Sequence, residues 1–251
     1  MDSQALRMTR ILSTIPVNSI DSKTHKPCSM GSGCFVNYKG HLIFFTVLHA
    51  VEVKTDILHG IVVDYDSEKC RTVLYEVNDF SICAMGDLRT KEVDIIDFAM
   101  KKFLTPMPPC KFLINKNHMG EFEKIDRIPL TSDLSIAPTT NEKYGFCGLI
   151  KGSLIETETV LGLYSTLAYY DNLRYLKSEN SYHIFVLENK NYSHKDFQGT
   201  SGAPIIDSKG NLVSLVMSGH QSPNNSNEWI IYGVNLSKFS TVIDVTCDLL
   251  I

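Results

Sequence analysis

Short runs of Val, Ile, Phe, Tyr and Thr, broken by Gly, Asp and Asn, extend over most of this chain. Runs of about four to eight such residues between turn residues are typical of β-strands, whereas helices need longer segments. Lys39-Gly40 and Lys209-Gly210 each lie between two such runs and predict tight hairpin turns. Because few helical segments separate the runs, we expect an all-β protein built of antiparallel barrels or a sandwich.

The expected strands form two groups with a connector between them. The first group is Cys34–Tyr38, Leu42–Leu48, Gly60–Tyr65, Thr72–Val77, Ser81–Met85 and Ile95–Phe103, and the second is Tyr144–Ile150, Leu154–Leu161, Tyr182–Leu187, Ala203–Ile206, Leu212–Met217 and Glu228–Val234. Residues 106–140 contain prolines and lysines and have weaker periodicity, which indicates a connector. Helices are expected only near the ends, over residues 1–12 and from Ser237 to about Leu250.

Length and charge exclude several classes of protein. A chain of 251 residues can bury a sizeable core as one large all-β domain or two small ones. Its net charge of −4 gives no reason to expect nucleic acid or a membrane as a partner. The longest apolar runs, such as Leu42–Leu48, are too short to span a bilayer, and residues 1–20 lack the unbroken apolar stretch of a secretory signal.

The seven cysteines are scattered and form no C-x-x-C pair. A disulfide framework or a zinc site would show paired, regularly spaced cysteines, so neither is expected. The sequence also has no metal-ligand spacing, phosphate loop or dinucleotide fingerprint, and we expect no metal or organic cofactor. Together with the missing secretory signal, the cysteines indicate reduced thiols in a cytoplasmic protein.

The most distinctive segment is Gln198–Pro204, which precedes the apolar pair Ile205-Ile206. A serine flanked by glycines just before a strand can present its hydroxyl on a tight turn. The backbone N–H groups of Gly199 and Ser201 can then converge on one point, as the stabilisation of an oxyanion requires. The alternative is that the segment is an ordinary Gly/Ser/Pro turn.

Two further segments place one polar residue in apolar surroundings. His49 ends the run that begins at Phe44, where it is either a satisfied core or edge residue or a general base. Asp97 lies inside the run Val93–Met100, and a buried carboxylate needs a partner such as a histidine N–H. A plain carboxylate at a strand end is the alternative.

In the order His49, Asp97, Ser201, the chain resembles the chymotrypsin/trypsin superfamily of serine proteases. The family motifs are Thr-Ala-Ala-His, Asp-hydrophobic-Ala-hydrophobic and Gly-Asp/Asn-Ser-Gly-Gly-Pro, to which the similar segments are Thr46–His49, Asp97–Met100 and Gly199–Pro204. Weaker similarity extends over about residues 28–250, including Gly31–Val36, Leu215–Gly219 and Tyr232–Val234.

The resemblance implies two antiparallel six-stranded β-barrels with the active site in the cleft between them, and a short C-terminal helix. It divides a single peptidase domain, 1–251, into a first barrel at about 28–105, the connector at 106–140, a second barrel at 141–236 and the helix at 237–250. Ala50 and Phe197 stand where exported members often carry cysteines. The chain is therefore closest in character to disulfide-free bacterial (Deg-type) or viral members.

By the same resemblance, Ser201 would be the nucleophile, His49 the general base and Asp97 the residue that orients the histidine. Asp94 is a rival for the last role. The backbone N–H groups of Gly199 and Ser201 would form the oxyanion hole. His41 and His59 are expected in surface or loop positions.

Residues on both sides of the nucleophile are expected to bind substrate, namely Lys195, Asp196, Gln198, Met217, Ser218 and Gly219. Asp196 would favour a basic substrate side chain, Lys195 would oppose it, and His194 or His220 would favour an acidic one, so no preferred residue is assigned. Thr200 stands where trypsin-type zymogens carry an acidic residue that pairs with a newly formed N-terminal amine. Because threonine cannot form that ion pair, we expect no activation of this kind.

These expectations favour an intracellular serine endopeptidase that hydrolyses peptide bonds of protein or peptide substrates through an acyl-enzyme. Limited, regulated proteolysis and a regulatory protein partner are expected by analogy with the family. One alternative is a pseudoprotease that keeps the double-barrel fold as a protein-binding module, and another is a non-protease barrel with a chance triad. Substitution of Ser201 or His49 separates these hypotheses, because a binding module would keep its partner affinity.

Overall fold

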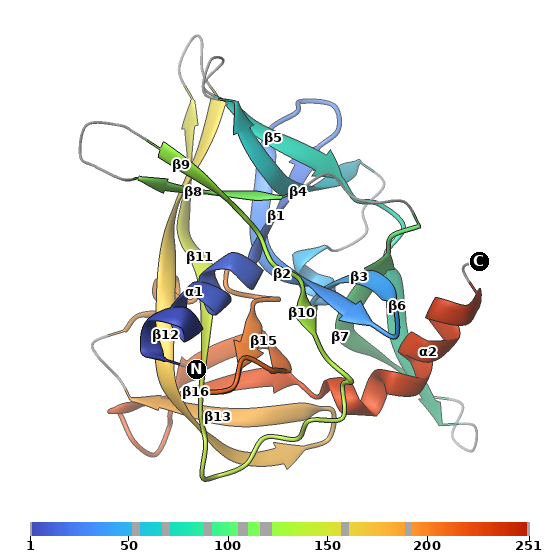
Figure 1. Ribbon diagram of the computed structural model, residues 1–251, viewed down its shortest axis with the longest axis vertical. Helices are drawn as coiled ribbons and strands as arrows, with labels where there is room; N and C mark the ends of the chain where they lie inside the picture. Colours follow the sequence, from blue (N-terminus) through green and yellow to red (C-terminus); the bar gives the residue numbers. More distant parts are fainter. Residues whose placement is uncertain are drawn as a thin grey trace.

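Antiparallel strands make up most of the molecule (Figure 1). The structure is a computed structural model that describes residues 2–51, 56–66, 71–87, 92–104, 110–115, 122–156, 161–188 and 192–249. Within these ranges the α-helices are α1 Ser3–Ser13 and α2 Ser240–Leu249, and single 3-10 turns are η1 Leu48–Ala50, η2 His194–Asp196 and η3 Leu236–Phe239. No helix among the described residues has the length and apolar character needed to cross a membrane.

The strands of the N-terminal half form one eight-stranded sheet with the order β5-β4-β1-β2-β3-β7-β6, and β10 pairs in parallel with β2. They are β1 Ile15–Asp21, β2 Pro27–Tyr38, β3 His41–Thr46, β4 Ile57–Asp66, β5 Arg71–Glu76, β6 Ser81–Asp87, β7 Glu92–Lys102 and β10 Leu130–Thr131. The sheet has more than the six strands expected for the first barrel, because it also includes β1 within the path and β10 beside β2, both of which begin outside residues 28–105.

The C-terminal half is a closed barrel with the order β11-β12-β13-β16-β15-β14. Its strands are β11 Lys143–Glu156, β12 Leu161–Glu179, β13 Tyr182–Glu188, β14 Pro204–Ile206, β15 Leu212–Gln221 and β16 Glu228–Val234. β11 and β12 run along one side of the molecule past both halves (Figure 1). A closed six-stranded barrel confirms the expected architecture of this half, although most of β12 had no counterpart among the predicted strands.

The connector contains strands that the sequence did not predict. β8 Lys111–Asn115 and β9 Phe122–Asp126 form a two-stranded antiparallel sheet, and β10 follows. The C-terminal helix also begins later than expected, since residues 236–239 form η3 before α2 starts at Ser240. The Ser237 hydroxyl donates to the Asn235 side chain at 2.7 Å within that turn.

Both predicted hairpin turns are present. Lys39 and Gly40 have φ values of 48° and 84°, and two successive positive values are typical of the tight turn between antiparallel strands. In the second turn, the Asp207 carboxylate accepts hydrogen bonds from the backbone N–H groups of Lys209 at 2.8 Å and Asn211 at 2.9 Å. These bonds explain why an aspartate begins this turn.

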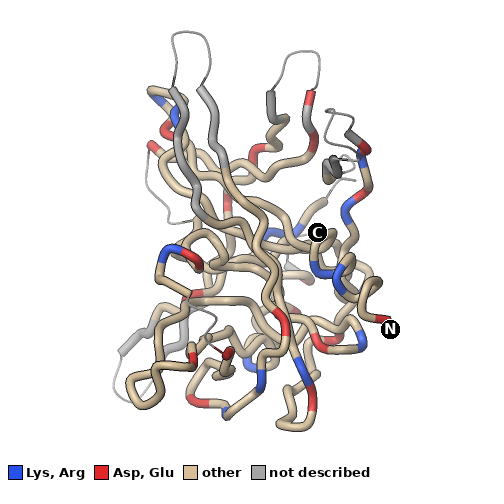
Figure 2. The backbone as a smooth tube through the Cα atoms, turned by 90° about the vertical axis from the view of Figure 1, so that its left-hand side faces the viewer, with Lys and Arg blue, Asp and Glu red and all other residues tan. Residues whose placement is uncertain are grey.

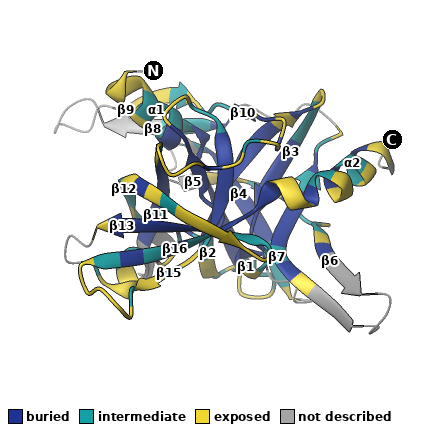
Figure 3. Ribbon diagram, turned by 90° about the horizontal axis from the view of Figure 1, so that it is seen from below, coloured by how far each residue is buried: buried dark blue, intermediate teal, exposed yellow. Residues whose placement is uncertain are grey.

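Three buried apolar clusters stabilise the fold, and one of them joins the two halves. That cluster contains Phe45 and Phe98 from the N-terminal sheet, Leu215 from the barrel and Phe239 from η3. Buried residues lie along the strands of both halves and exposed residues along α2 (Figure 3). Basic and acidic residues are interspersed along the chain (Figure 2).

Candidate active site

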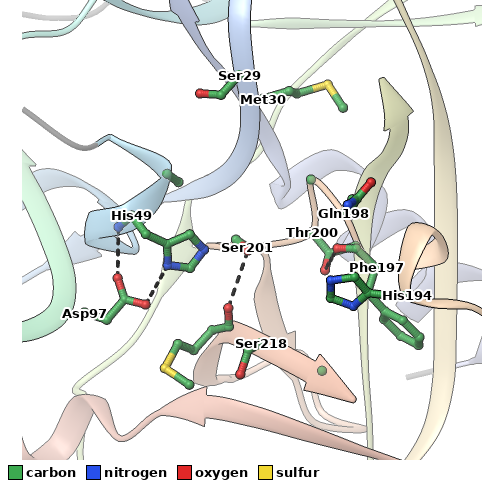
Figure 4. Close-up of a pocket in the computed structure, with 14 residues that line it drawn as sticks. Ser29, Met30, His49, Asp97, His194, Phe197, Gln198, Thr200, Ser201 and Ser218 are labelled. Atoms are coloured by element: carbon green, nitrogen blue, oxygen red, sulfur yellow. Dashed lines mark hydrogen bonds and ion pairs between the residues drawn. The ribbon is translucent and has the colours of Figure 1, made fainter. Parts of the chain in front are cut away.

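A cavity of about 540 Å³ is lined by residues from both halves of the molecule. The N-terminal half contributes Ser29, Met30, His49, Ala50 and Asp97, and the C-terminal half contributes His194, Phe197, Gln198, Gly199, Thr200, Ser201, Met217, Ser218 and Gly219. The three residues of the predicted triad therefore lie in one cavity, although they are far apart in the sequence (Figure 4).

The pairing of β3 with β7 places His49 beside Asp97. Thr46, the last residue of β3, pairs with Ala99 on β7, and His49 follows in η1. The backbone N–H of His49 donates to Asp97 Oδ1 at 2.9 Å, and His49 Nδ1 lies 2.6 Å from Asp97 Oδ2. An ionised carboxylate only accepts hydrogen bonds, so Nδ1 carries the proton and Nε2 of the neutral ring is free to accept one.

Ser201 lies on the turn between η2 and β14, and the imidazole of His49 stands between it and Asp97 (Figure 4). The Ser201 hydroxyl donates to the backbone carbonyl of Met217 at 3.4 Å. Within the described part of the chain, no hydrogen bond joins this hydroxyl to the histidine ring. Catalytic hydrogen bonds are often long in a site without substrate and tighten when substrate binds.

The turn around Ser201 requires glycine at two positions. Gly199 and Gly202 have φ values of 95° and 87°, in the left-handed region that favours glycine. A Cβ atom on Gly202 would lie 1.9 Å from the Ser32 carbonyl oxygen, so no other residue fits there. Among the described residues, neither the Gly199 N–H nor the Ser201 N–H has a hydrogen-bond partner, and both residues line the cavity. The turn can therefore offer two backbone donors to a negatively charged oxygen.

Thr200 is buried and bonds within the turn. Its hydroxyl donates to the Phe197 carbonyl at 2.8 Å, and its backbone N–H donates to the same oxygen at 3.1 Å. Its own carbonyl accepts from the Ala203 N–H at 2.9 Å. These bonds are local to the turn and involve no charged group.

Four of the six predicted substrate-binding residues line the cavity, namely Gln198, Met217, Ser218 and Gly219. Lys195 and Asp196 are not among the lining residues, and their part in substrate binding stays a prediction. They belong to η2, where the Asp196 carboxylate accepts from both the backbone N–H and the hydroxyl of Ser193 at 2.8 Å, and Lys195 is exposed. The charge of Asp196 is therefore directed at its own turn.

The cavity also contains residues that the sequence did not indicate. Ser29 and Met30 come from the beginning of β2, which the sequence placed outside the strands. Phe197 is 5% exposed and packs against Tyr170 and Trp229, with ring centroids 5.0 and 4.7 Å away. A position that was noted only for its lack of a cysteine thus supplies an apolar part of the cavity wall.

Of the other histidines that the structure describes, His194 lines the cavity with His49, and the rest lie in other settings. His59 is buried on β4 with its Nδ1 3.1 Å from the Ser19 hydroxyl, and burial lowers its pKa, so the expectation of a surface or loop position is corrected. Burial, with a smaller contribution from Lys238, lowers the pKa of His183 to about 4. His41 is part of β3, and His220 is exposed and stacks on Tyr232.

Asp94 lies on β7 like Asp97, but its side chain is outside the described residues. Cys70 is outside them as well, and none of the other six cysteines is part of a disulfide bond. Among the side chains that the structure describes, no three His, Cys, Asp or Glu residues come together in a group that could hold a metal ion.

No protein-family model and no curated protein matches this sequence. Solved structures do match over nearly their whole length. An inactivated protease paralogue of the scabies mite, S-D1, is 12% identical with a TM-score of 0.54, over 96% of this chain and 94% of that chain. Neuropsin, a serine protease expressed in the limbic system of mouse brain, is 12% identical with a TM-score of 0.51, over 92% and 93% of the two chains.

The fold is that of the chymotrypsin-like serine proteases. At this level of identity the likeness shows the chymotrypsin-like fold and not the activity, and the mite protein is described as inactivated. The activity of the present chain has to be argued from its own site.

Proposed function

We propose that this chain is a serine endopeptidase that hydrolyses peptide bonds of protein or peptide substrates through an acyl-enzyme. The observation that carries the proposal is the doubly bonded Asp97–His49 pair facing Ser201 in one cavity. A free pair of backbone N–H groups beside the hydroxyl supports it further. These are the parts that acyl transfer needs, namely a nucleophile, an oriented base and donors for the oxyanion.

In the proposed reaction, the Ser201 hydroxyl attacks the scissile carbonyl carbon while His49 Nε2 takes its proton. The negative charge on the former carbonyl oxygen is stabilised by the N–H groups of Gly199 and Ser201. His49 then gives its proton to the leaving amine, and Asp97 stabilises the imidazolium that exists between these two steps. Water activated by His49 attacks the acyl-enzyme, which releases the carboxylic acid and restores the Ser201 hydroxyl.

We infer that the residue before the cleaved bond is uncharged. Asp196 bonds to Ser193 and Lys195 is exposed, and neither lines the cavity. His194 does line it, but its side chain is exposed to solvent and is not a buried charge. The wall between the nucleophile turn and Gly219 includes the apolar ring of Phe197. Burial of an unpaired charge against such a wall is unfavourable.

None of the six described cysteines is part of a disulfide bond, which supports an intracellular enzyme closest in character to disulfide-free Deg-type or viral proteases. An active protease in the cytoplasm needs narrow specificity or control, so limited proteolysis under a regulatory protein partner is part of the proposal. The second candidate is a protein-binding pseudoprotease, which the likeness to an inactivated paralogue favours. The intact pairing of His49 with Asp97 is an argument against it.

Hydrolysis of an unfolded protein such as casein by the purified full chain tests the proposal. Ser201→Ala and His49→Asn should each lower the rate by about 10⁴–10⁶, because triad residues act as a unit. Ser208→Ala and His25→Asn, at exposed positions outside the cavity, are the matched controls and should keep the wild-type rate. Hydrolysis that survives in Ser201→Ala, or none in the folded wild type, would refute the proposed activity.

A further inference from the structure

Ser32 on β2 links the nucleophile turn to the strand that carries the base. It is fully buried, with 0% of its surface exposed. Its hydroxyl donates to the Gly199 carbonyl at 2.9 Å, and its backbone N–H donates to the Ser201 carbonyl at 2.8 Å. Its own carbonyl accepts from the hydroxyl of Thr46 at 2.7 Å, and Thr46 ends β3 just before His49. One buried residue therefore contacts both halves of the site.

The peptide groups of the turn differ in how they are held. The carbonyls of Phe197, Thr200 and Ser201 each accept a backbone hydrogen bond. Among the described residues, no hydrogen bond is made by the Gln198 carbonyl or the Gly199 N–H, which belong to the same peptide group. That peptide group carries one of the two donors proposed for the oxyanion.

The backbone of glycine rotates more freely than that of any other residue type, and Gly199 has a φ of 95°, in the region that glycine alone enters easily. The Ser32 hydroxyl holds the Gly199 carbonyl, which is the nearest bonded group on the C-terminal side of the loose peptide. The same peptide group is also held by the Thr200 N–H, which donates to the Phe197 carbonyl at 3.1 Å, so loss of the Ser32 bond leaves it one hydrogen bond within the turn and none to the neighbouring half. The Gly199 N–H on the other side of the glycine Cα would then be held less firmly in the cavity. An ion pair at the residue before the nucleophile cannot take over the role of the Ser32 hydrogen bond, because that residue is the uncharged Thr200.

We propose that Ser32 is a positioning residue that keeps the Gly199 N–H directed into the cavity. In this chain a hydroxyl from the neighbouring half orders the turn, without an ion pair at the residue before the nucleophile. The proposal rests on the proposed peptidase function for its effect on rate. The effect of the Ser32 hydrogen bond on the order of the turn can be measured independently of any activity.

The test compares Ser32→Ala with Ser214→Ala in the full chain. Ser214 is also 0% exposed, and its hydroxyl donates to the Val234 carbonyl at 2.7 Å, away from the cavity lining. Each substitution removes one buried serine hydrogen bond, so both variants should lose similar thermal stability. Amide hydrogen exchange over residues 197–203 should become faster in Ser32→Ala and stay unchanged in Ser214→Ala.

The rate should separate the two variants in the same way. Loss of one oxyanion donor costs about 10²–10³ in rate, so a donor that is only loosened should cost about 10–10², in kcat and not in KM. Equal rates of amide hydrogen exchange over residues 197–203 in the two serine variants, or an unchanged kcat in Ser32→Ala, would overturn the proposed role of Ser32. A wild-type protein without hydrolysis would refute the peptidase function instead, and the exchange measurement would then decide on Ser32 alone.

Discussion

Asp97 holds His49 at two points, through the backbone N–H at 2.9 Å and through ring Nδ1 at 2.6 Å. The first bond fixes the position of η1, which contains His49, and the second fixes which ring nitrogen carries the proton. The carboxylate is partly buried, with 22% of its side chain exposed. Burial, and to a smaller extent the charge of Asp97, also raises the pKa of Tyr182 on β13.

Replacement of the carboxylate by an amide should remove this control of the tautomer. Asp97→Asn should lower kcat by about 10³–10⁴ with little change in KM, because an amide group can donate to Nδ1 and so leave the proton on the wrong nitrogen. Asp94→Asn, three residues earlier on the same strand, is the matched control and should keep kcat within about twofold. If Asp94→Asn loses the activity and Asp97→Asn keeps it, the orienting residue is misassigned.

The surroundings of Gly202 and Gly40 differ, so substitution by alanine should lower the free energy of unfolding by different amounts at the two positions. Both have positive φ, at 87° and 84°, but a Cβ atom on Gly40 meets nothing within 4 Å. Gly40→Ala should lower the free energy of unfolding by roughly 1–2 kcal/mol, the cost of a left-handed backbone. Gly202→Ala adds the clash with the Ser32 carbonyl and should cost roughly 3–5 kcal/mol. Equal denaturant midpoints for the two variants would contradict the packing of the turn against β2.

The site was predictable from the sequence where a local pattern sets the chemistry. His49 ends an apolar run, Asp97 interrupts one, and Ser201 lies in a glycine-rich turn just before another, and these patterns are visible without a structure. The pocket was less predictable, because a residue number does not tell which way a side chain in a short turn is directed. Asp196 was expected in the pocket, but it bonds to Ser193 and stabilises the start of η2. The role of Ser32 depends on contacts across the sequence and has no local pattern.

Polar residues interrupt the apolar pattern in two of the strands that the sequence did not predict in full, β1 and β12. The second half of β1 carries Asn18 and Ser19, which are buried although polar, so the apolar pattern that marks a strand stops early. Ser19 reaches His59 on β4, a partner 40 positions away that no local window includes. β12 contains polar and charged residues along its 19 positions, since it runs past both halves and has exposed stretches.

Peptide substrates that differ in one residue test the absence of charge in the pocket. Substrates with Ala or Leu before the cleaved bond should have a kcat/KM at least about tenfold above those with Arg, Lys, Asp or Glu. Lys195→Ala should leave this ranking unchanged, because Lys195 is exposed and outside the cavity lining. A preference for Arg or Lys would show that the charge of Asp196 reaches the substrate after all.

Acid should destabilise the protein through His183 before its carboxylates titrate. Its pKa falls from 6.5 to about 4 on folding, chiefly by burial, so the unfolded state binds the proton first as the pH decreases. The stabilisation is complete above about pH 6.5 and is lost toward pH 4, by roughly 2 kcal/mol at pH 5. The free energy of unfolding of His183→Gln should therefore depend less on pH between 7 and 5 than that of the wild type. Parallel pH profiles for the two proteins would contradict the assignment.

The central claim is that His49, Asp97 and the N–H groups of the turn make Ser201 a nucleophile. Reaction with a fluorophosphonate probe, followed by mass mapping of the modified peptide, tests it without knowledge of the substrate. The wild type, Ser208→Ala and His25→Asn should form one covalent adduct at Ser201, and Ser201→Ala and His49→Asn should form none. An adduct at another serine, or a folded wild-type chain that does not react, would contradict the claim.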